Sequence, residues 1–320
     1  KEATVYNGVI FDSIYPETDW YPGFVRDDAL IESQIPKVLD DEETWSKFNP
    51  RVGLEYQVSD DMMVFTSYSQ GFKSGTFNPR ATGAEPAVDP ETVNSYEIGM
   101  KSEWNDNLRV NATLFYLDHK DRQFVTVLPG EDSSDLNQRL GNIGKSTATG
   151  LELEVEYAAT DSLNLFANLG LIDATFDEVI SYDELGNKID ISDTYTITNT
   201  PDTTANLGFS YSIEADVGSF IINGNYYYRS DYDLAVVDNL LSQDGYGLLN
   251  FGVNWYSNDG HWNAGLHWKN VTDEEYLVGN YAFVTPTGNG DFTPGLGGDN
   301  TLIGYYGDPE TISLTVGYVF

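Results

Sequence analysis

Apolar and polar residues alternate one by one along most of the chain. In the stretch LELEVEYA, Leu151, Leu153 and Val155 share one face, and Glu152 and Glu154 share the other. Successive side chains of a β-strand point to opposite faces, so this period of two predicts strands with one apolar and one polar face. We count about twelve such strands, at residues 2–11, 44–58, 62–73, 91–104, 107–120, 143–158, 162–176, 200–214, 218–231, 244–257, 261–272 and 309–320.

The connections between these strands alternate in length. Short turns are expected at 59–61, 105–107, 160–161, 214–218 and 258–260, and long loops at 12–43, 74–90, 121–142, 177–199, 232–243 and 273–308. Consecutive antiparallel strands with this alternation place all tight turns at one end and all long loops at the other, which is the layout of an outer-membrane β-barrel. A β-sandwich has no reason to sort its loops by length in this way.

Aromatic residues mark the ends of the apolar faces. Those next to short turns predict an interfacial girdle: Trp104, Tyr157, Trp255 and Trp262. The last strand, TISLTVGYVF, alternates up to Phe320, the final residue of the sequence. Outer-membrane barrels typically end on such an aromatic residue, and we expect the barrel assembly machinery to recognise Phe320.

Composition narrows the class of protein. The 320 residues include 51 Asp+Glu, 16 Lys+Arg and no Cys, with a formal charge of −35. These counts exclude a disulfide scaffold and a thiol nucleophile, and the absence of a basic face argues against a nucleic-acid partner. No run of about 18 apolar residues predicts a transmembrane helix. A soluble acidic β protein, such as a lectin, and a membrane β-barrel both fit these data.

The acidic residues gather in the long loops. Loop 12–43 contains ten acidic and two basic residues, and loop 177–199 contains six acidic residues and one basic residue. The simpler interpretation is a solvated surface that resists aggregation. The alternative is Ca²⁺ bound by Asp-rich loops in the absence of any EF-hand spacing.

Several stretches resemble the C-terminal barrel portion of TonB-dependent outer-membrane receptors. They include NPRVGLEYQVSDDMMVFTSYSQGFKSGTFN (49–78), ETVNSYEIGMKSEWNDNLRVNATLFYLDHKD (91–121), NIGKSTATGLELEVEYAATDSLNLFANLGLIDATF (142–176) and GYYGDPETISLTVGYVF (304–320). The resemblance covers most of residues 44–320, in the order of the family. It implies an antiparallel transmembrane β-barrel of 22 strands with an N-terminal plug, on which TonB pulls to admit a bound ligand.

About twelve strands and no plug domain are expected within residues 1–320. We therefore interpret the whole chain as the C-terminal portion of the receptor barrel. Its first strand, Ala3–Phe11, should cross the membrane from the periplasmic side. Twelve strands from a wider barrel should form an open curved sheet rather than a closed one.

The implied function is TonB-linked active uptake of a scarce nutrient across the outer membrane of a Gram-negative bacterium, first of all a ferric siderophore. Cobalamin, a nickel chelate or a glycan taken up by the same mechanism are alternatives, as is a passive porin-like channel. Expected partners are the TonB complex acting through the plug, outer-membrane lipid and the small-molecule ligand. No enzyme is expected, because the three His residues show no nucleophile constellation and no phosphate-binding fingerprint occurs.

The polar faces of the strands should line the lumen. Basic residues are scarce there, and anionic ferric chelates would be held by cationic or aromatic walls. Alternation places these candidate ligand-binding residues near the long-loop end: Lys73, Arg229, Tyr232, His267 and Lys269. The alternative is that the cations pair with lumen acids, as expected for Glu103 and Arg109 across a short turn. No catalytic or metal-binding residue is expected.

Overall fold

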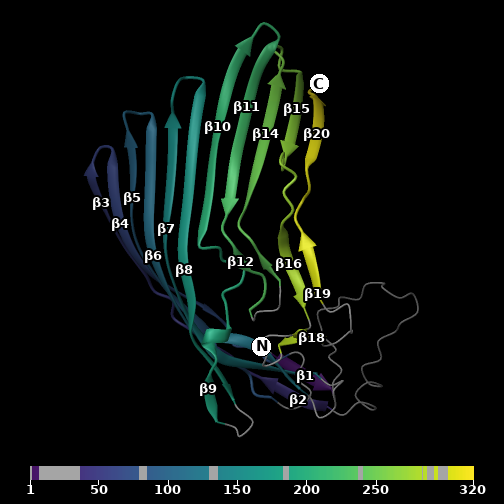
Figure 1. Cartoon of the computed structure of the whole chain (residues 1–320). Helices are drawn as coiled ribbons and strands as arrows, with labels where there is room; N and C mark the ends of the chain where they lie inside the picture. The colour runs from purple at the N-terminus through teal and green to yellow at the C-terminus, as the bar shows by residue number, and fades with distance from the viewer. Residues whose placement is uncertain are drawn as a thin grey trace.

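One long antiparallel sheet dominates the computed structural model of the chain (Figure 1). The structure describes residues 2–6, 37–78, 85–129, 136–182, 187–236, 241–282, 284–286, 292–294 and 302–320. The sheet follows chain order through β3 (Arg51–Ser59), β4 (Met62–Lys73), β5 (Glu91–Trp104), β6 (Leu108–Pro129), β7 (Leu136–Ala158), β8 (Leu163–Tyr182), β10 (Thr203–Ala215), β11 (Gly218–Arg229), β14 (Tyr246–Tyr256), β15 (Trp262–Lys269) and β20 (Thr311–Tyr318). A short twelfth strand, β9 (Lys188–Asp190), pairs with the far end of β8.

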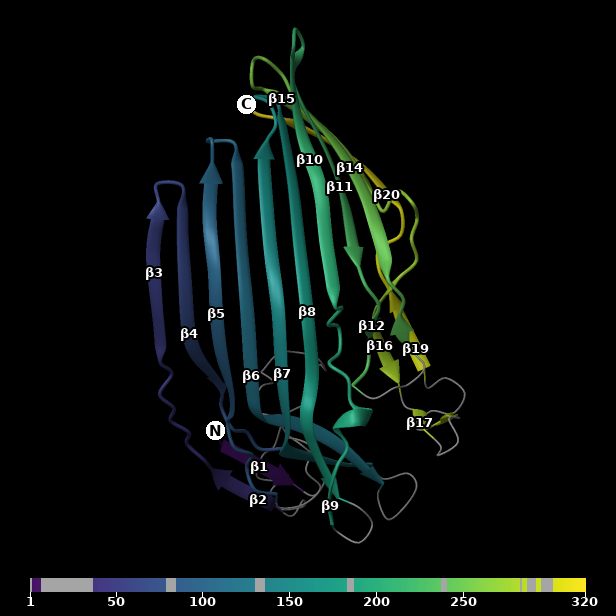
Figure 2. The ribbon, with the colours of Figure 1, turned by 60° about the vertical axis from the view of Figure 1, so that its left-hand side comes forward.

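The sheet is open, as expected. Each strand pairs with the next along the chain, and no described strand pairs with the second edge of β3 or of β20. The two views show a sheet that curves into a trough (Figures 1 and 2). Eleven of the expected strands form this trough, so the all-β architecture is confirmed.

The two ends of the trough differ in their connections. Figure 2 shows tight turns at one end and long connections at the other, as the alternation of loop lengths predicts. At the turn between β5 and β6, Asn105 and Asp106 adopt φ angles of 51° and 59°. Asn and Asp tolerate this left-handed conformation better than other non-glycine residues, which explains why NDN reverses the chain here.

The first expected strand is wrong. Glu2–Tyr6 (β1) pairs with Lys37–Glu42 (β2) in a separate two-stranded sheet at the long-loop end, and residues 7–11 lie outside the described part of the chain. Further pairs in the same region are β12 (Tyr232–Asp233) with β13 (Ser242–Gln243), β16 (Leu277–Ala282) with β19 (Leu302–Tyr306), and β17 (Val284–Pro286) with β18 (Phe292–Pro294).

The expected loop 121–142 is largely strand. The hairpin of β6 and β7 continues past residue 120, with irregular register between His119 and Arg122. β6 has 22 residues, whereas about 9–11 residues suffice for a tilted strand to cross a bilayer. The distal part of this hairpin therefore projects beyond the membrane. The remaining regular element is a short 3-10 turn, η1 (Ser192–Thr194), that lies beside β8.

The outer face of the sheet is apolar and exposed. Ala112, Leu153 and Leu169 lie side by side on β6, β7 and β8. On the same face, Ile98, Leu114 and Leu207 remain 59%, 54% and 55% exposed. A continuous exposed apolar surface of this kind is typical of the outer face of a membrane barrel.

Two rows of aromatic residues border this apolar band. Trp104, Tyr157 and Trp262 lie by the short turns, and Trp262 packs on Tyr318 with ring centroids 4.7 Å apart. Nearer the long loops, Tyr68, Tyr96 and Tyr116 form a row with centroids 5.1 and 6.2 Å apart. The eight residue steps from Tyr96 to Trp104 correspond to a height of about 20 Å for a tilted strand, close to the apolar band of about 25 Å in such barrels.

Polar residues take over the outer face beyond the tyrosine row. Asn94 accepts a hydrogen bond from the Tyr68 hydroxyl at 3.0 Å, and Asp118 pairs with Lys120 at 2.9 Å. We therefore take the tyrosine row as the outer border of the membrane-spanning part. Within the described part of the chain, no helix is both long and apolar enough to cross a membrane.

An arginine on the outer face should be far more disruptive than one on the inner face. Leu153→Arg places a charge within the apolar band and is expected to destabilise the folded receptor by about 2–4 kcal/mol. Urea unfolding of the full-length protein in lipid vesicles measures the change. Glu152→Arg, one residue away on the inner face, is the matched control and should change stability by less than about 1 kcal/mol. Equal losses in both variants would contradict the assignment of the faces.

Candidate functional site

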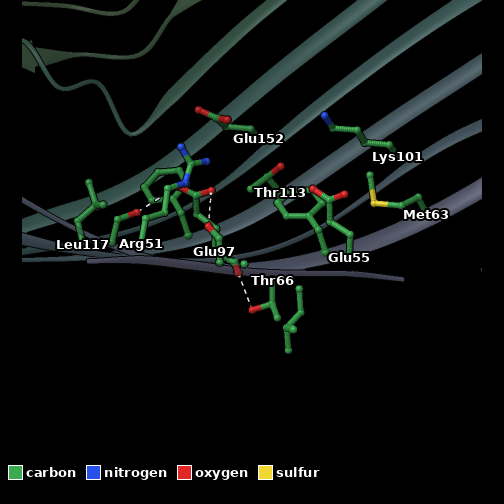
Figure 3. Close-up of a pocket in the computed structure, with 15 residues that line it drawn as sticks. Arg51, Glu55, Met63, Thr66, Glu97, Lys101, Thr113, Leu117 and Glu152 are labelled. Carbon is green, nitrogen blue, oxygen red and sulfur yellow. Dashed lines mark hydrogen bonds between the residues drawn. The ribbon is translucent and has the colours of Figure 1, made fainter. Parts of the chain in front are cut away.

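The inner face of the trough encloses a hollow between β3 and β7. Its volume is about 830 Å³, and its charged lining residues are Arg51, Glu55, Glu97, Lys101 and Glu152. Figure 3 shows Glu97, Lys101 and Glu152 on one side of the sheet, while Thr66 lies on the opposite side. The hollow carries both signs of charge, which suits a polar, water-filled lumen.

Hydrogen bonds fix only part of this lining. The carboxylate of Glu97 accepts hydrogen bonds from the hydroxyls of Ser67 at 3.2 Å and Ser95 at 3.1 Å. Arg51 forms no ion pair with any described residue. Lys101 lies over the Phe65 ring, with its Nζ atom 5.9 Å from the ring centroid, and also has no described carboxylate partner. These two cations are available to groups inside the lumen.

Phenylalanine rings of the inner face lie across glycines of neighbouring strands. Phe65 lies over Gly99, Phe115 over Gly150, and Phe166 over Gly208; the first and second pairs lie in the hollow or at its border. A Cβ atom at any of these glycines would come within 2.7 Å of a ring carbon. Glycine at these positions therefore allows each ring to lie flat against the wall.

The other half of the inner face carries a ladder of neutral amide groups. Asn225 donates a hydrogen bond to Asn206 at 2.9 Å, and Asn250 donates to Asn225 at 3.4 Å. The amide oxygen of Asn250 in turn accepts from the backbone N–H of Asn270 at 3.0 Å. This ladder satisfies the amide groups across three strands and links the wall to the long connection after β15.

A buried carboxylate joins three strands where the trough meets the long loops. Glu91, at the start of β5, is 6% exposed and pairs with Lys73 of β4. The ring of His119 donates from Nε2 to the Glu91 carboxylate at 3.0 Å, and the backbone N–H of Gln123 donates to it at 3.3 Å. The side chain of Gln123 also donates to the backbone carbonyls of Ser74 and Asp89 at 3.1 and 2.9 Å.

The charges of this junction depend on its surroundings. Burial by itself raises the pKa of Glu91, but the hydrogen bond and charge of Lys73, with the Gln123 amide and His119, outweigh burial and hold the pKa below its ordinary value. Burial and the nearby Arg122 lower the pKa of His119, although Glu91 opposes them. Both shifts mean that the folded state binds fewer protons than the unfolded state. The junction is therefore stable at neutral pH and weakens as the pH falls through these lowered pKa values.

Arg122 lies next to this junction inside a group of aromatic rings. Its guanidinium carbon is 5.4 Å from the Phe124 centroid and 4.8 Å from the Phe176 centroid, and Nη1 donates to the Ser146 hydroxyl at 2.9 Å. Tyr195 meets both phenylalanine rings edge-on, with centroids 6.1 Å away.

The structure separates the candidate ligand-binding residues into three places. Lys73 belongs to the Glu91 junction, although its side chain is still 61% exposed. Arg229 stacks on Tyr232 at 4.1 Å and donates from Nη2 to the Asn199 carbonyl at 3.1 Å. Tyr232 is 5% exposed and donates its hydroxyl hydrogen to the Leu277 carbonyl at 2.7 Å. Tyr232 thus packs in a small apolar core, where a ligand would have to displace existing contacts.

His267 and Lys269 form the third place, on the inner face of β15. They follow each other at alternate positions, and Lys269 is exposed without a described ion-pair partner. The strands between β4 and β15 separate them from Lys73. The five candidates therefore do not form one site, and their contact with a ligand stays a prediction.

The expected pair of Glu103 and Arg109 is only half right. The two residues lie opposite each other across the turn, as the register arithmetic requires. However, the Arg109 guanidinium forms its ion pair with Glu156, on the other neighbouring strand, at 3.0 Å. The pair is exposed, so it adds little to stability.

Sequence reasoning missed Glu91 and Arg122. Glu91 could have been found, because it is the acid directly opposite Lys73 at the ends of two strands. Arg122 could not, because counting by twos from His119 puts it on the outer face. The irregular register between these residues places two residues of β6, Lys120 and Asp121, against one residue of β7, Lys145, and this turns Arg122 inward.

Metal binding in the acidic loops stays a prediction. Among the described residues, no group of three or more His, Asp or Glu side chains could hold a metal ion. Most of loop 12–43 lies outside the described residues.

Comparison with known proteins now identifies the class. The family described as "TonB dependent receptor-like, beta-barrel" matches residues 19–271, so the chain belongs to this family. The chain is thus part of an outer-membrane β-barrel of a Gram-negative bacterium, and its family consists of receptors and transporters rather than enzymes.

The sequence identity to individual members of the family is low. The pesticin receptor of Yersinia enterocolitica is 27% identical over 71% of this chain and 31% of its own length. The metal-pseudopaline receptor CntO of Pseudomonas aeruginosa is 31% identical over 44% of this chain and 19% of its own. The chain spans about a third or less of these relatives. The crystal structure of the ferric yersiniabactin uptake receptor FyuA from Yersinia pestis superposes with a TM-score of 0.65 at 20% identity, covering 84% of this chain and 37% of that chain.

Removing the buried carboxylate should loosen the junction locally. Glu91→Ala leaves Lys73, His119 and the Gln123 amide without their acceptor, and lost hydrogen bonds of this kind cost about 1–3 kcal/mol. Hydrogen–deuterium exchange of the full-length receptor should speed up about tenfold or more in peptides covering 85–93 and 119–125. Glu97→Ala, which removes a carboxylate bonded only to serines, is the control and should leave these peptides unchanged. Unaltered exchange in Glu91→Ala would show that the carboxylate does not hold the junction.

Proposed function

We propose that this chain is the C-terminal barrel portion of a receptor for TonB-linked active uptake of a ferric siderophore. Family membership together with the similarity to a structure named as a ferric yersiniabactin uptake receptor carries the proposal. The wide inner hollow supports it, because a bulky chelate needs a broad passage. Uptake would further require a plug domain and the TonB complex, both outside the described chain.

Two further partners belong to this proposal. Lipid would cover the outer face between the two aromatic rows, where large apolar side chains remain exposed. The barrel assembly machinery would recognise Phe320, which follows β20 and lies fully exposed beside Tyr318.

A different transition-metal chelate is the second candidate. The similarity to a metal-pseudopaline receptor favours it. In this case the bound chelate would differ, and the uptake mechanism would be the same. Nickel chelates fall in this group. Cobalamin and glycans would use the same mechanism, but the relatives described above offer no support for them.

A complete passive channel has less support. It would need residues 1–11 to pair with residues 309–320 and close the barrel. Glu2–Tyr6 instead pairs with β2, and the outer edge of β20 has no described partner.

Deleting the full-length gene should abolish growth on at least one ferric siderophore under iron limitation. Uptake of ⁵⁵Fe-labelled chelates from a panel of siderophores measures the loss, and a strain lacking TonB should show the same loss. Unlabelled nickel and zinc chelates in parallel test the second candidate. Undiminished uptake from every iron source in the deletion strain would contradict the siderophore proposal, and uptake that persists without TonB would favour a passive channel.

A further inference from the structure

Arg122 differs from the basic residues around it in having no carboxylate partner. Lys73 pairs with Glu91, Lys120 with Asp118, and Lys145 with Glu178. Arg122 instead bonds the neutral hydroxyl of Ser146, and no described carboxylate lies within ion-pair distance. The chain has 51 acidic and only 16 basic residues, so an available carboxylate would be easy to place there.

Two phenylalanine rings, tilted 60° to each other, flank the guanidinium. Phe124 and Phe176 pack on it at 5.4 and 4.8 Å, and their own centroids are 5.4 Å apart. A Cβ atom at Gly144, opposite Arg122, would lie 2.6 Å from the Phe124 ring, so glycine there leaves room for this ring. Stacking on aromatic rings favours a guanidinium over an ammonium because the guanidinium is flat.

Most hydrogen-bond donors of Arg122 remain unused. A guanidinium has five N–H donors, and one goes to Ser146. The other guanidinium nitrogens form no hydrogen bond with a described residue, and none of them is completely buried. The side chain is thus fixed in place while a donor edge stays accessible, which is the arrangement that binds a planar anion with little loss of entropy.

The local charge also favours an anion. Glu91 is the carboxylate that acts on Arg122, and it is already engaged by Lys73, His119 and the Gln123 amide. With a neutral imidazole, the group of Lys73, Glu91, His119 and Arg122 has a net charge of about +1. A neighbouring hollow that also borders Phe176 and Tyr195 is lined by Asp193, Asp202, Asp231, Asp233 and Asp244, so the favourable charge is confined to this group.

We infer that Arg122, framed by Phe124, Phe176 and Tyr195, binds a planar aryl anion, meaning an aromatic ring that carries a carboxylate or phenolate. The anion accepts a bidentate hydrogen bond from two N–H groups of the guanidinium. The aryl ring packs against the exposed edges of Phe124, Phe176 and Tyr195. This inference deepens the proposed function and rests on it for one point, namely that the anion is an arm of an iron chelate. A free aryl acid has the same chemistry, and the test separates the two.

Binding of 2,3-dihydroxybenzoate to the full-length receptor in detergent tests the site directly. Saturation-transfer NMR compares this anion with the uncharged 2,3-dihydroxybenzamide. We expect the anion to bind at least tenfold more tightly than the amide. Arg122→Gln should remove this preference, and Arg122→Lys should restore part of it, because a lysine keeps the charge but not the flat donor edge. Arg109→Gln is the control, since it removes an inner-wall arginine that is already paired with Glu156.

A second variant distinguishes loss of the binding site from a failure to fold. Phe176→Leu keeps the guanidinium charge but removes one stacking ring, and it should weaken anion binding about threefold to tenfold. Adding iron(III) separates the sources: tighter binding of the iron complex indicates a chelate arm, and equal binding indicates a free aryl acid. Equal affinity of wild type and Arg122→Gln for the anion, or no preference of the wild type for the anion over the amide, would overturn the inference. Neither result depends on the uptake assay, so the proposed uptake function and the proposed anion-binding site are tested independently.

Discussion

Everything in this fold follows from the need to pair backbone N–H and C=O groups inside hydrocarbon, where water cannot bond them. Long antiparallel strands in chain order meet this need for eleven successive strands, each bonded to its neighbours along the sequence. The same geometry forces side chains onto two faces. One face therefore exposes apolar side chains such as Ile98, Leu114 and Leu207, while the other carries charged and amide groups.

Much of this architecture could be predicted from alternation and turn chemistry alone. The eleven strands of the trough, their order, the segregation of loop lengths and the two faces all agree with the pattern, whereas the short strands within the expected long loops do not follow from it. The first strand failed because alternation in EATVY identifies an extended segment but not its partner, and that partner is β2. The length of β6 and β7 was underestimated because their distal parts pair with each other beyond the membrane, where the apolar face that reveals a spanning strand ends.

The candidate site could be predicted only in part, for reasons of geometry. Alternation predicts the face on which a residue lies, but each inner residue has a possible partner on both neighbouring strands. Alternation therefore could not predict that Arg109 forms its ion pair with Glu156 and not with Glu103. A local irregularity in the register interrupts the alternation just before Arg122, which hid this residue. The position of Glu91 opposite Lys73 could be read from the register, but its burial and its three donors are known only from the structure.

The phenylalanine rings that lie on Gly99, Gly150 and Gly208 have a mechanical consequence. Each ring fills the gap that the glycine leaves without a side chain. The rings therefore make the wall more apolar without obstructing the interior of the trough. The wall is therefore filled but not raised at these three positions. A large object that moves past them meets less steric resistance than it would from rings that stood upright.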